Sequence, residues 1–449
     1  MKGSSLMSAY FILVVILVTL FILPLTKVSA QSSAMWDKTY GGTEWDRAKS
    51  LVVTSDGGYA IVGRTNSFGE GGGDAWLVKT DALGNMMWNH SYGGTNFDAA
   101  ISLVVTSDGG YAVAGFTSSF GAGDADFWLV KTDSYGNMVW QEAYGGTGLD
   151  RAYAVVVAPD GGYALAGYTN SFDSEGYDFW LVKTDSSGNM EWSQTYGGTE
   201  YEYAFSMVAT SDGGYAMAGE TGSFGAEGDF WLVKTDASGN MLWSQNYGVG
   251  TKYDRAYSLA VTSDGSYVMA GSTAISDENV DFALVKTDSS GNMVWQKTYG
   301  KTAGDYGVSD DTPNSVVQTD DGGYALAGYI GPSATGADAW LVKTDANGDM
   351  EWNQTYGESG DDLAYCVVQT SDGGYVLAAE KSTVGDEDFD FWLVKTDEFG
   401  VIPEFPSWTI LPLGLLVLVI ASVYRKKLRG CWFSHTWDFV VTEVISKKD

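Results

Sequence analysis

A seven-fold internal repeat of about 52 residues constrains this chain more than any other feature of its sequence. Every copy contains a Tyr-Gly pair, an Asp-Gly-Gly or Asp-Gly-Ser turn followed by tyrosine, and a Leu-Val-Lys-Thr-Asp run. The tyrosines of the Tyr-Gly pairs are Tyr40, Tyr92, Tyr144, Tyr196, Tyr247, Tyr299 and Tyr356. The lysines of the runs are Lys79, Lys131, Lys183, Lys234, Lys286, Lys343 and Lys395. A period of this length predicts an array of similar units, each completed by its neighbours.

Each copy predicts four short strands. In the third copy these cover 152–157, 163–169, 178–184 and 190–196, and Asp-Gly or Gly-Asn pairs, which tolerate positive φ, mark the hairpin turns. The strands are apolar almost without alternation, which suits sheets covered on both faces. The sequence therefore predicts an all-β fold, a closed seven-bladed β-propeller of four-stranded blades.

The two ends of the repeat array predict how the ring closes. The last copy stops at Gly400 without its fourth strand, whereas an additional strand over 34–40 precedes the first copy. One completes the other, so the propeller is expected to span 31–400 with no free blade edge.

A tryptophan hairpin follows each of the first six lysine runs, in the pattern Asp-x-x-Gly-Asn/Asp-Met-x-Trp. Its tryptophans are Trp88, Trp140, Trp192, Trp243, Trp295 and Trp352. This hairpin resembles the tryptophan-docking hairpin of quinoprotein-type propellers, in which the indole packs against the adjacent blade. The Asp-to-Gly spacing here is one residue shorter, and nothing resembles a quinone site, so the resemblance implies a fold and no cofactor.

The first thirty residues predict a signal peptide. Lys2 precedes an apolar run, and Val28-Ser29-Ala30 supplies the small residues of a cleavage site. An uncleaved N-terminal membrane anchor is the alternative interpretation. Either way, the propeller is expected outside the cell.

The C-terminal region predicts a second link to a membrane. A short linker at 401–407 leads to an uncharged apolar segment at 408–424, which is expected to span the bilayer, and to a basic cytoplasmic tail at 425–449. Pro403, Glu404 and Phe405, with the segments behind them, resemble the Pro-Glu-Phe sorting signal of archaeal surface proteins. That resemblance implies cleavage and transfer to a lipid. The chain continues past the point where such signals stop, so simple single-pass anchoring remains the alternative.

The composition of the chain limits the kinds of molecule that it is expected to bind. The formal net charge of −32 disfavours nucleic acid and anionic lipid, both of which are polyanions. The two cysteines, Cys366 and Cys431, lie on opposite sides of the predicted membrane segment, which excludes a disulfide between them.

Candidate chemistry is sparse. His90 and His435 are the only histidines, which excludes a catalytic triad or a histidine-rich metal site in the propeller. One carboxylate per copy precedes the innermost strand: Asp46, Asp98, Asp150, Glu202, Asp254, Asp311 and Asp362. We expect them in a ring at the mouth of the central channel. They would either bind Ca²⁺ or, as Arg47, Arg151 and Arg255 beside three of them also suggest, make local structural hydrogen bonds.

A second set of aspartates precedes the third strand of each copy: Asp74, Asp126, Asp178, Asp229, Asp281, Asp338 and Asp390. Their recurrence indicates a structural role. The lysines of the Leu-Val-Lys-Thr runs are expected to pair with them and hold the blades in register.

The loops that join second to third strands, and blade to blade, vary between copies, as in 66–73, 170–177 and the insertion 301–311. Loops on a rigid scaffold tolerate change, so we expect recognition on the rim that these loops share. The leading hypothesis is a non-enzymatic, membrane-anchored surface module for adhesion to a glycan or protein. The alternatives are an envelope component that packs laterally with other copies and a carboxylate-based polysaccharide hydrolase.

The path of the chain also predicts an orientation. It leaves the propeller on the face of the short, constant turns, and few residues separate that point from the apolar segment. The tight-turn face is therefore expected to look toward the membrane, and the variable rim away from it.

Overall fold

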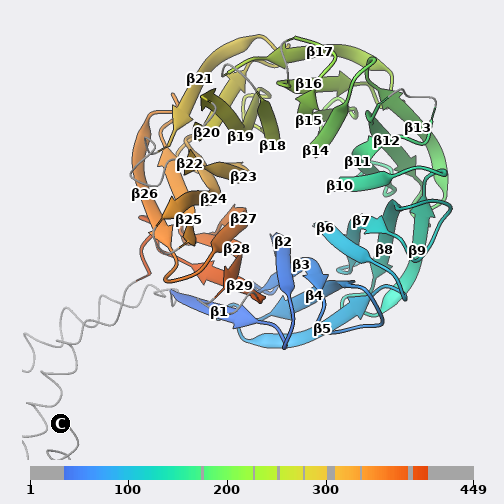
Figure 1. The fold of residues 1–449 in the computed structure, drawn as a ribbon, viewed down its shortest axis with the longest axis horizontal. Helices are drawn as coiled ribbons and strands as arrows, with labels where there is room; N and C mark the ends of the chain where they lie inside the picture. Colours follow the sequence, from blue (N-terminus) through green and yellow to red (C-terminus); the bar gives the residue numbers. More distant parts are fainter. Residues whose placement is uncertain are drawn as a thin grey trace, which may run out of the picture. The chain divides into compact units, whose positions relative to one another are not determined.

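The computed structural model describes residues 35–172, 176–225, 228–249, 253–276, 279–300, 309–333, 336–382 and 388–402. The chain divides after Val401, and the first unit contains a ring of seven β-sheets (Figure 1). The predicted signal peptide, apolar segment and tail, and the sorting motif Pro403 to Phe405, lie outside the described residues. Within those residues, no helix is long and apolar enough to cross a membrane.

The first four blades follow one another along the chain and share one strand order, innermost to outermost. Blade 1 is formed by β2 (Asp46–Val53), β3 (Tyr59–Thr65), β4 (Asp74–Thr80) and β5 (Met86–Tyr92). Blade 2 is formed by β6 (Asp98–Val105), β7 (Tyr111–Thr117), β8 (Asp126–Thr132) and β9 (Met138–Tyr144). Blade 3 is formed by β10 (Asp150–Val157), β11 (Tyr163–Thr169), β12 (Asp178–Thr184) and β13 (Met190–Tyr196). Blade 4 is formed by β14 (Glu202–Ala209), β15 (Tyr215–Thr221), β16 (Asp229–Thr235) and β17 (Met241–Tyr247).

The last three blades carry the departures from this pattern. Blade 5 is formed by β18 (Asp254–Val261), β19 (Tyr267–Ser276), β20 (Asn279–Thr287) and β21 (Met293–Tyr299), with the short β22 (Ser309–Asp310) parallel to β20. Blade 6 is formed by β23 (Thr312–Gln318), β24 (Tyr324–Ser333), β25 (Gly336–Thr344) and β26 (Met350–Tyr356). Blade 7 is formed by β27 (Asp362–Gln369), β28 (Tyr375–Ser382), β29 (Phe389–Lys395) and β1 (Trp36–Tyr40).

The predicted strands of the third copy agree with the structure at three of four positions. β10 begins two residues earlier than predicted because Asp150 still pairs with Thr169. A register shift between Ala152 and Ala154 marks a bulge in the same strand. An irregularity of this kind is invisible in a sequence that reads as uniformly apolar.

Ring closure by the N-terminal strand is confirmed. β1 runs antiparallel to β29, with Trp36 opposite Lys395 and Tyr40 opposite Phe391. Tyr40 is buried in a core cluster shared with blade 1, and its hydroxyl donates a hydrogen bond of 2.6 Å to the carbonyl of Gly84 there. The first strand of the chain thus completes the last blade and joins it to the first.

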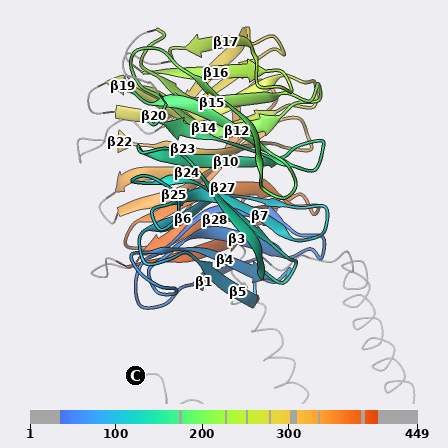
Figure 2. The same ribbon diagram turned by 90° about the vertical axis from the view of Figure 1, so that its right-hand side faces the viewer.

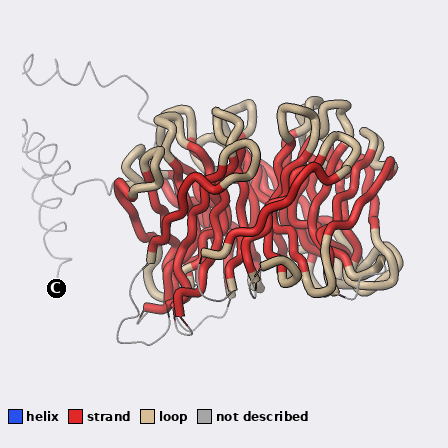
Figure 3. Tube along the Cα trace, turned by 90° about the horizontal axis from the view of Figure 1, so that it is seen from above, coloured by secondary structure: helices blue, strands red, loops and turns tan. Residues whose placement is uncertain are grey.

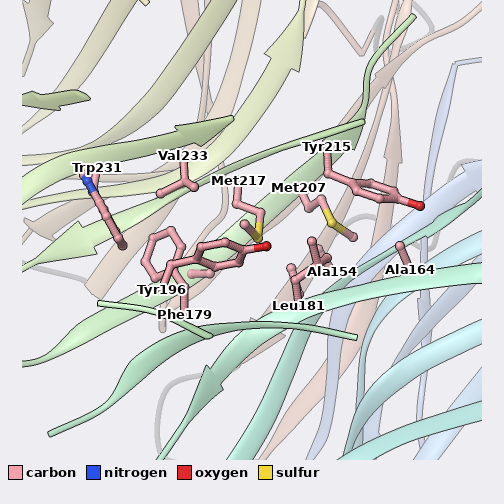
Figure 4. Packing of buried hydrophobic residues seen from close by; sticks show 12 residues of the cluster. Ala154, Ala164, Phe179, Leu181, Tyr196, Met207, Tyr215, Met217, Trp231 and Val233 are labelled. Carbon is pink, nitrogen blue, oxygen red and sulfur yellow. The ribbon is translucent and has the colours of Figure 1, made fainter. Parts of the chain in front are cut away.

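The hydrophobic core lies between neighbouring sheets rather than at one centre. In the cluster of Figure 4, Leu181 from blade 3 packs with Met217 and Trp231 from blade 4. Phe179 meets Trp231 with ring centroids 4.6 Å apart, and Phe127 meets Trp180 in the same way at the preceding junction, 4.4 Å apart. Because each sheet is covered on both faces, its middle strands are apolar without alternation.

The outer strands add a second contact across each junction. At the junction of blades 1 and 2, Gly136 has a φ of +81°, and a Cβ on it would lie 2.5 Å from the indole of Trp88. The hydroxyl of Tyr92 donates to the Gly136 carbonyl at 2.6 Å. Glycine is therefore required both for the turn and for the close approach of the indole. The resemblance of this hairpin to those of quinoprotein-type propellers stays a prediction.

Two sets of loops emerge from the two edges of the strands (Figures 2 and 3). One edge, which we call the tight-turn face, carries the hairpins between first and second and between third and fourth strands. The other edge, which we call the variable rim, carries the loops between second and third strands and those that link the blades. Both sets of candidate carboxylates lie at the variable rim, whereas the lysines of the Leu-Val-Lys-Thr runs lie at the tight-turn face.

Candidate functional site

The seven predicted channel-mouth carboxylates lie at the variable rim, at or just before the start of each innermost strand. All have 0% exposed surface. In blade 2, Asp98 accepts hydrogen bonds from the hydroxyl of Thr117, from Ser119 Oγ at 2.7 Å and from the Gly94 amide at 2.8 Å. Such a carboxylate connects two rim loops to its strand. These contacts correspond to the local structural hydrogen bonds that the sequence analysis gave as the alternative to Ca²⁺ binding.

The three arginines beside these carboxylates have other contacts. Arg47 stacks over the rings of Trp45 and Phe389, and Arg151 lies over Phe116, 4.5 Å from the ring centre. Arg255 donates to Glu220 at 2.6 Å. Each arginine therefore connects its innermost strand to the preceding blade.

The second set of aspartates converges on the first set across the blade junctions. A Cβ placed on Gly145 would lie 2.0 Å from Asp126 Oδ1 and 2.5 Å from Asp150 Oδ2. The glycine of the Tyr-Gly pair thus leaves the space in which two carboxyl groups meet. Asp126 is almost fully buried, and its Oδ1 has no hydrogen-bond partner among the described residues.

In several of these pairs, one of the two carboxyl groups has a raised pKa. Burial, and after it the facing carboxylate of Asp98 or Glu202, raises the pKa of Asp74 and of Asp178 to about 6. Burial likewise raises the pKa of Asp362 to about 6. One proton held between two carboxyl groups would satisfy the oxygen that lacks a partner and would remove the repulsion.

The predicted partners of the seven lysines are wrong. Each lysine instead pairs with the aspartate of the Asp-Gly turn on the tight-turn face, at 2.7 to 3.6 Å. Lys131, for example, donates to Asp108 and to the carbonyl of Thr132. The reason is geometric: Asp126 and Lys131 lie at opposite ends of β8, and five residues of extended strand separate them by about 17 Å.

Metal binding gains no support from these sites. No group of three or more His, Cys, Asp or Glu side chains in the described part of the chain could hold a metal ion. At six of the seven blade junctions, two carboxyl groups face each other across the glycine of the Tyr-Gly pair. Ca²⁺ takes about six to eight oxygen ligands. The calcium hypothesis for the seven carboxylates stays a prediction.

A group of aromatic residues that the sequence analysis missed lies at the variable rim of blades 3 to 5. We call it the aromatic cluster. It consists of Tyr153, Tyr168, Tyr177, Tyr201, Tyr203, Phe205 and Tyr257. Tyr203 is its centre, with ring centroids 4.8 Å from Tyr168 and 5.3 Å from Tyr177. Tyr168 is buried, and the other six are partly exposed.

The aromatic cluster follows the innermost strands across three blades. Phe205 lies 5.3 Å from Tyr153 of blade 3 and 5.3 Å from Tyr257 of blade 5, between ring centroids. These three residues occupy one position of the repeat. The same position in the other blades is filled by Lys49, Ile101, Asn314 and Tyr365.

Blades 7 and 1 have an ionic group at this level instead. Lys49 donates to the fully buried Glu380 at 2.9 Å and lies 3.3 Å above the ring of Tyr365. Burial lowers the pKa of Lys49, while Glu380 opposes the shift. The innermost strands therefore have an aromatic arc on blades 3 to 5 and an ionic group on blades 7 and 1.

A signal for the aromatic cluster was present in the sequence. Three residues after each rim carboxylate, the repeat carries lysine, isoleucine, tyrosine, phenylalanine or asparagine while its flanking residues stay nearly constant.

Comparison with known proteins shows the fold. No protein-family model matches the chain. The regulatory protein FlaEY of Caulobacter vibrioides is 28% identical over 197 residues, which is 40% of this chain but only 19% of that protein.

Two solved structures illustrate the likeness. An ulvan lyase, a polysaccharide lyase bound to -[GlcA(1-4)Rha3S]-, has a TM-score of 0.54 at 10% identity and covers 82% of this chain and 98% of its own. The WD40 domain of Neurospora crassa Pan2 has a TM-score of 0.47 at 9% identity, covering 79% and 91%. At such identities the likeness concerns the propeller fold alone.

Proposed function

We propose that this protein is a membrane-anchored cell-surface propeller that binds an extracellular glycan through its variable rim, without chemical turnover. The observation that carries the proposal is the aromatic cluster on blades 3 to 5. It interrupts an otherwise regular repeat, and six of its seven rings are partly exposed at the edge where the loops also vary.

The composition of the aromatic cluster favours a sugar over an apolar partner. Six of its seven residues are tyrosines, which combine a flat apolar face with a hydroxyl. A pyranose ring has the matching surface, with C–H groups on its faces and hydroxyls at its edge. An aliphatic patch would be expected for a purely apolar ligand.

The charge of the protein limits the charge that the ligand is expected to have. The chain has a formal net charge of −32, and seven buried carboxylates lie at the same rim. A strongly anionic polymer would be repelled by this field. A neutral glycan is therefore favoured.

A polysaccharide hydrolase is the second candidate. The carboxyl pair of Asp178 and Glu202, with the pKa of Asp178 raised to about 6, has the kind of shifted acidity that a general acid requires. The ulvan lyase, with the same fold, acts on a polysaccharide. However, equivalent pairs recur at other junctions and are buried, which favours a structural role. A lateral envelope component is the third candidate.

Binding of neutral oligosaccharides to the purified full-length protein tests the proposal. Phe205→Ala and Tyr257→Ala should each weaken binding by about tenfold, equal to about 1.4 kcal/mol of lost contact. Tyr135→Ala is the matched control, because it removes an exposed aromatic side chain from the opposite face.

The outcomes separate the three candidates. Equal binding by all variants, or no binding of any neutral oligosaccharide, would reject the rim as a glycan site. Release of shortened sugars that is lost in Asp178→Asn but not in Asp74→Asn would favour the hydrolase. Concentration-dependent sheet formation without sugar would favour lateral packing.

A further inference from the structure

The tips of the seven turns between third and fourth strands differ in chemistry although their backbones agree. In each turn the leading aspartate accepts hydrogen bonds from the amides two and four residues later, as Asp81 does from Leu83 and Asn85, each at 2.8 Å. The residue two positions after the aspartate forms the tip. The seven tips are Leu83, Tyr135, Ser187, Ser238, Ser290, Asn347 and Phe399.

The three apolar tips belong to consecutive blades of the closed ring. Phe399 is 59% exposed on blade 7, Leu83 is 52% exposed on blade 1 and Tyr135 is 71% exposed on blade 2. Serine or asparagine serves equally well at the tips of blades 3 to 6, so the turn itself does not require an apolar side chain. We call these three residues the apolar tips.

Further exposed apolar side chains surround the apolar tips on the same blades. Met87 is 58% exposed and Val139 is 61% exposed at the starts of the outer strands. The equivalent residues of blades 4 and 5, Leu242 and Val294, are exposed to a similar degree, 56% and 57%. Val53 and Val105 are exposed at the ends of the innermost strands, beside the other set of tight turns. The three apolar tips therefore distinguish blades 7, 1 and 2 from the other blades, and exposed apolar side chains on neighbouring blades indicate an interaction surface.

The position of these residues identifies the partner. Phe399 lies in the last turn of the propeller, and the described chain ends three residues later at Ile402. The apolar segment predicted to span a bilayer begins at Trp408, and six extended residues reach no further than about 20 Å. If 408–424 enters a membrane, blade 7 and its neighbours are held near the surface of that membrane.

From this we infer that the tight-turn face of blades 7, 1 and 2 rests on the lipid bilayer, with Leu83, Tyr135 and Phe399 inserted among the headgroups. Tyrosine is enriched at this depth, and leucine and phenylalanine contribute the apolar contact. The turn aspartates Asp81, Asp133 and Asp397 accompany the apolar tips, so the headgroups should be zwitterionic rather than anionic. The propeller would then stand tilted, with blades 3 to 6 raised.

A second copy of the chain fits this surface less well. A stable interface between proteins buries about 1,000 Å² or more with a well-packed core. Three separate turn tips, each rising from its own blade, offer points of insertion rather than a continuous surface. This inference rests on the membrane anchoring in the proposed function and is independent of the proposed glycan site, which lies at the opposite edge.

Lipid-borne quenching of a fluorophore tests the inference. The full-length chain, with Cys366 and Cys431 replaced by serine, is placed one copy per nanodisc of phosphatidylcholine that contains a brominated lipid. A maleimide fluorophore is attached at Leu83→Cys, Tyr135→Cys or Phe399→Cys. The matched controls are Ser187→Cys, Ser238→Cys and Ser290→Cys, the same turn position on the other blades.

We expect quenching at the three apolar tips, by about twofold or more, and none at the three serine positions. Equal quenching at all six positions, or none at any, would overturn the inference. Burial of the fluorophores only when several copies share one disc would assign the surface to a second copy of the chain and would also overturn it. Thermal unfolding of each labelled chain verifies that the propeller is intact.

Discussion

The two edges of this propeller are built from the same repeat but use it differently. On the tight-turn face, each of the seven lysines pairs with the aspartate of its own Asp-Gly turn. The turns of all blades close by the same backbone hydrogen bonds. On the variable rim, the buried carboxylates repeat, but the residues above them change from Lys49 and Glu380 to a continuous group of tyrosines. Repetition therefore provides the scaffold, and the departures from it lie where we propose that other molecules bind.

The difference extends to charge. The tight-turn carboxylates are exposed and paired with lysine, which with nearby hydroxyl and amide donors holds the pKa of Asp108 down at about 2. The rim carboxyl groups are buried against one another, which raises the pKa of Asp178 to about 6. The tight-turn pairs should therefore stabilise the protein less in acid, and the rim pairs should stabilise it less at neutral pH.

The largest expected effect is on the ring itself. Deletion of residues 34–40 removes β1, exposes the edge of β29 and opens the junction with blade 1. The loss should exceed about 5 kcal/mol, because removal of one buried aromatic residue alone costs about 3–5 kcal/mol. Chemical denaturation measures it, and a synthetic peptide of residues 34–40 added in trans should restore part of the loss. An unchanged denaturation midpoint would show that the ring does not depend on this strand.

A single contact between blades should have a smaller effect. Tyr92→Phe removes the hydroxyl that donates to the Gly136 carbonyl and leaves this buried acceptor without its partner. The free energy of unfolding should fall by about 1–2 kcal/mol. Tyr135→Phe, at a position that is 71% exposed, is the control and should change nothing measurable. Equal effects of the two variants would mean that the hydroxyl contributes nothing to docking.

The carboxyl pairs at the rim predict a dependence on pH. The pKa of Asp178, about 6 in the folded protein, exceeds its value of about 4 in the unfolded chain, so the folded state binds the proton more tightly. The resulting stabilisation is present below about pH 4 and is lost as the pH rises through about 6.

Asp178→Asn should remove this dependence. The variant should gain about 1 kcal/mol at pH 7.5, after allowance for solvent screening, and little at pH 4. Unfolding at a series of pH values measures both. If the variant were destabilised equally at every pH, Asp178 would be acting as an ionised structural acceptor.

The smallest effect is expected from the tight-turn pairs. The pKa of Asp108 is about 2 in the folded state, below its unfolded value of about 4, so its stabilisation is present above about pH 4 and lost as the pH falls toward 2. Asp108→Asn should cost less than about 1 kcal/mol at pH 7, because its carboxylate is mostly exposed. It should also flatten the loss of stability below pH 4. If the variant lost stability below pH 4 as steeply as the wild type, this pH dependence would arise from a group other than Asp108.

Much of the fold could be predicted from the sequence because each copy repeats the same turn residues and apolar strand patterns. The strands 163–169, 178–184 and 190–196 were placed correctly by their turn residues, and the orphan strand at the N-terminus revealed the closure. The partner of Lys131 was predicted wrongly, because a sequence pattern does not indicate which end of a strand meets which turn. The aromatic cluster was missed because its members come from three copies and meet only through packing between blades.

The sequence by itself determined the number of blades, their strands and the strand that closes the ring, since turns and apolar runs act locally and recur seven times. Only the tertiary structure decided which carboxylates face one another, which tyrosines assemble, and that three apolar turn tips are neighbours. Those relations depend on the ring, which brings blade 7 beside blade 1 although they lie at opposite ends of the chain.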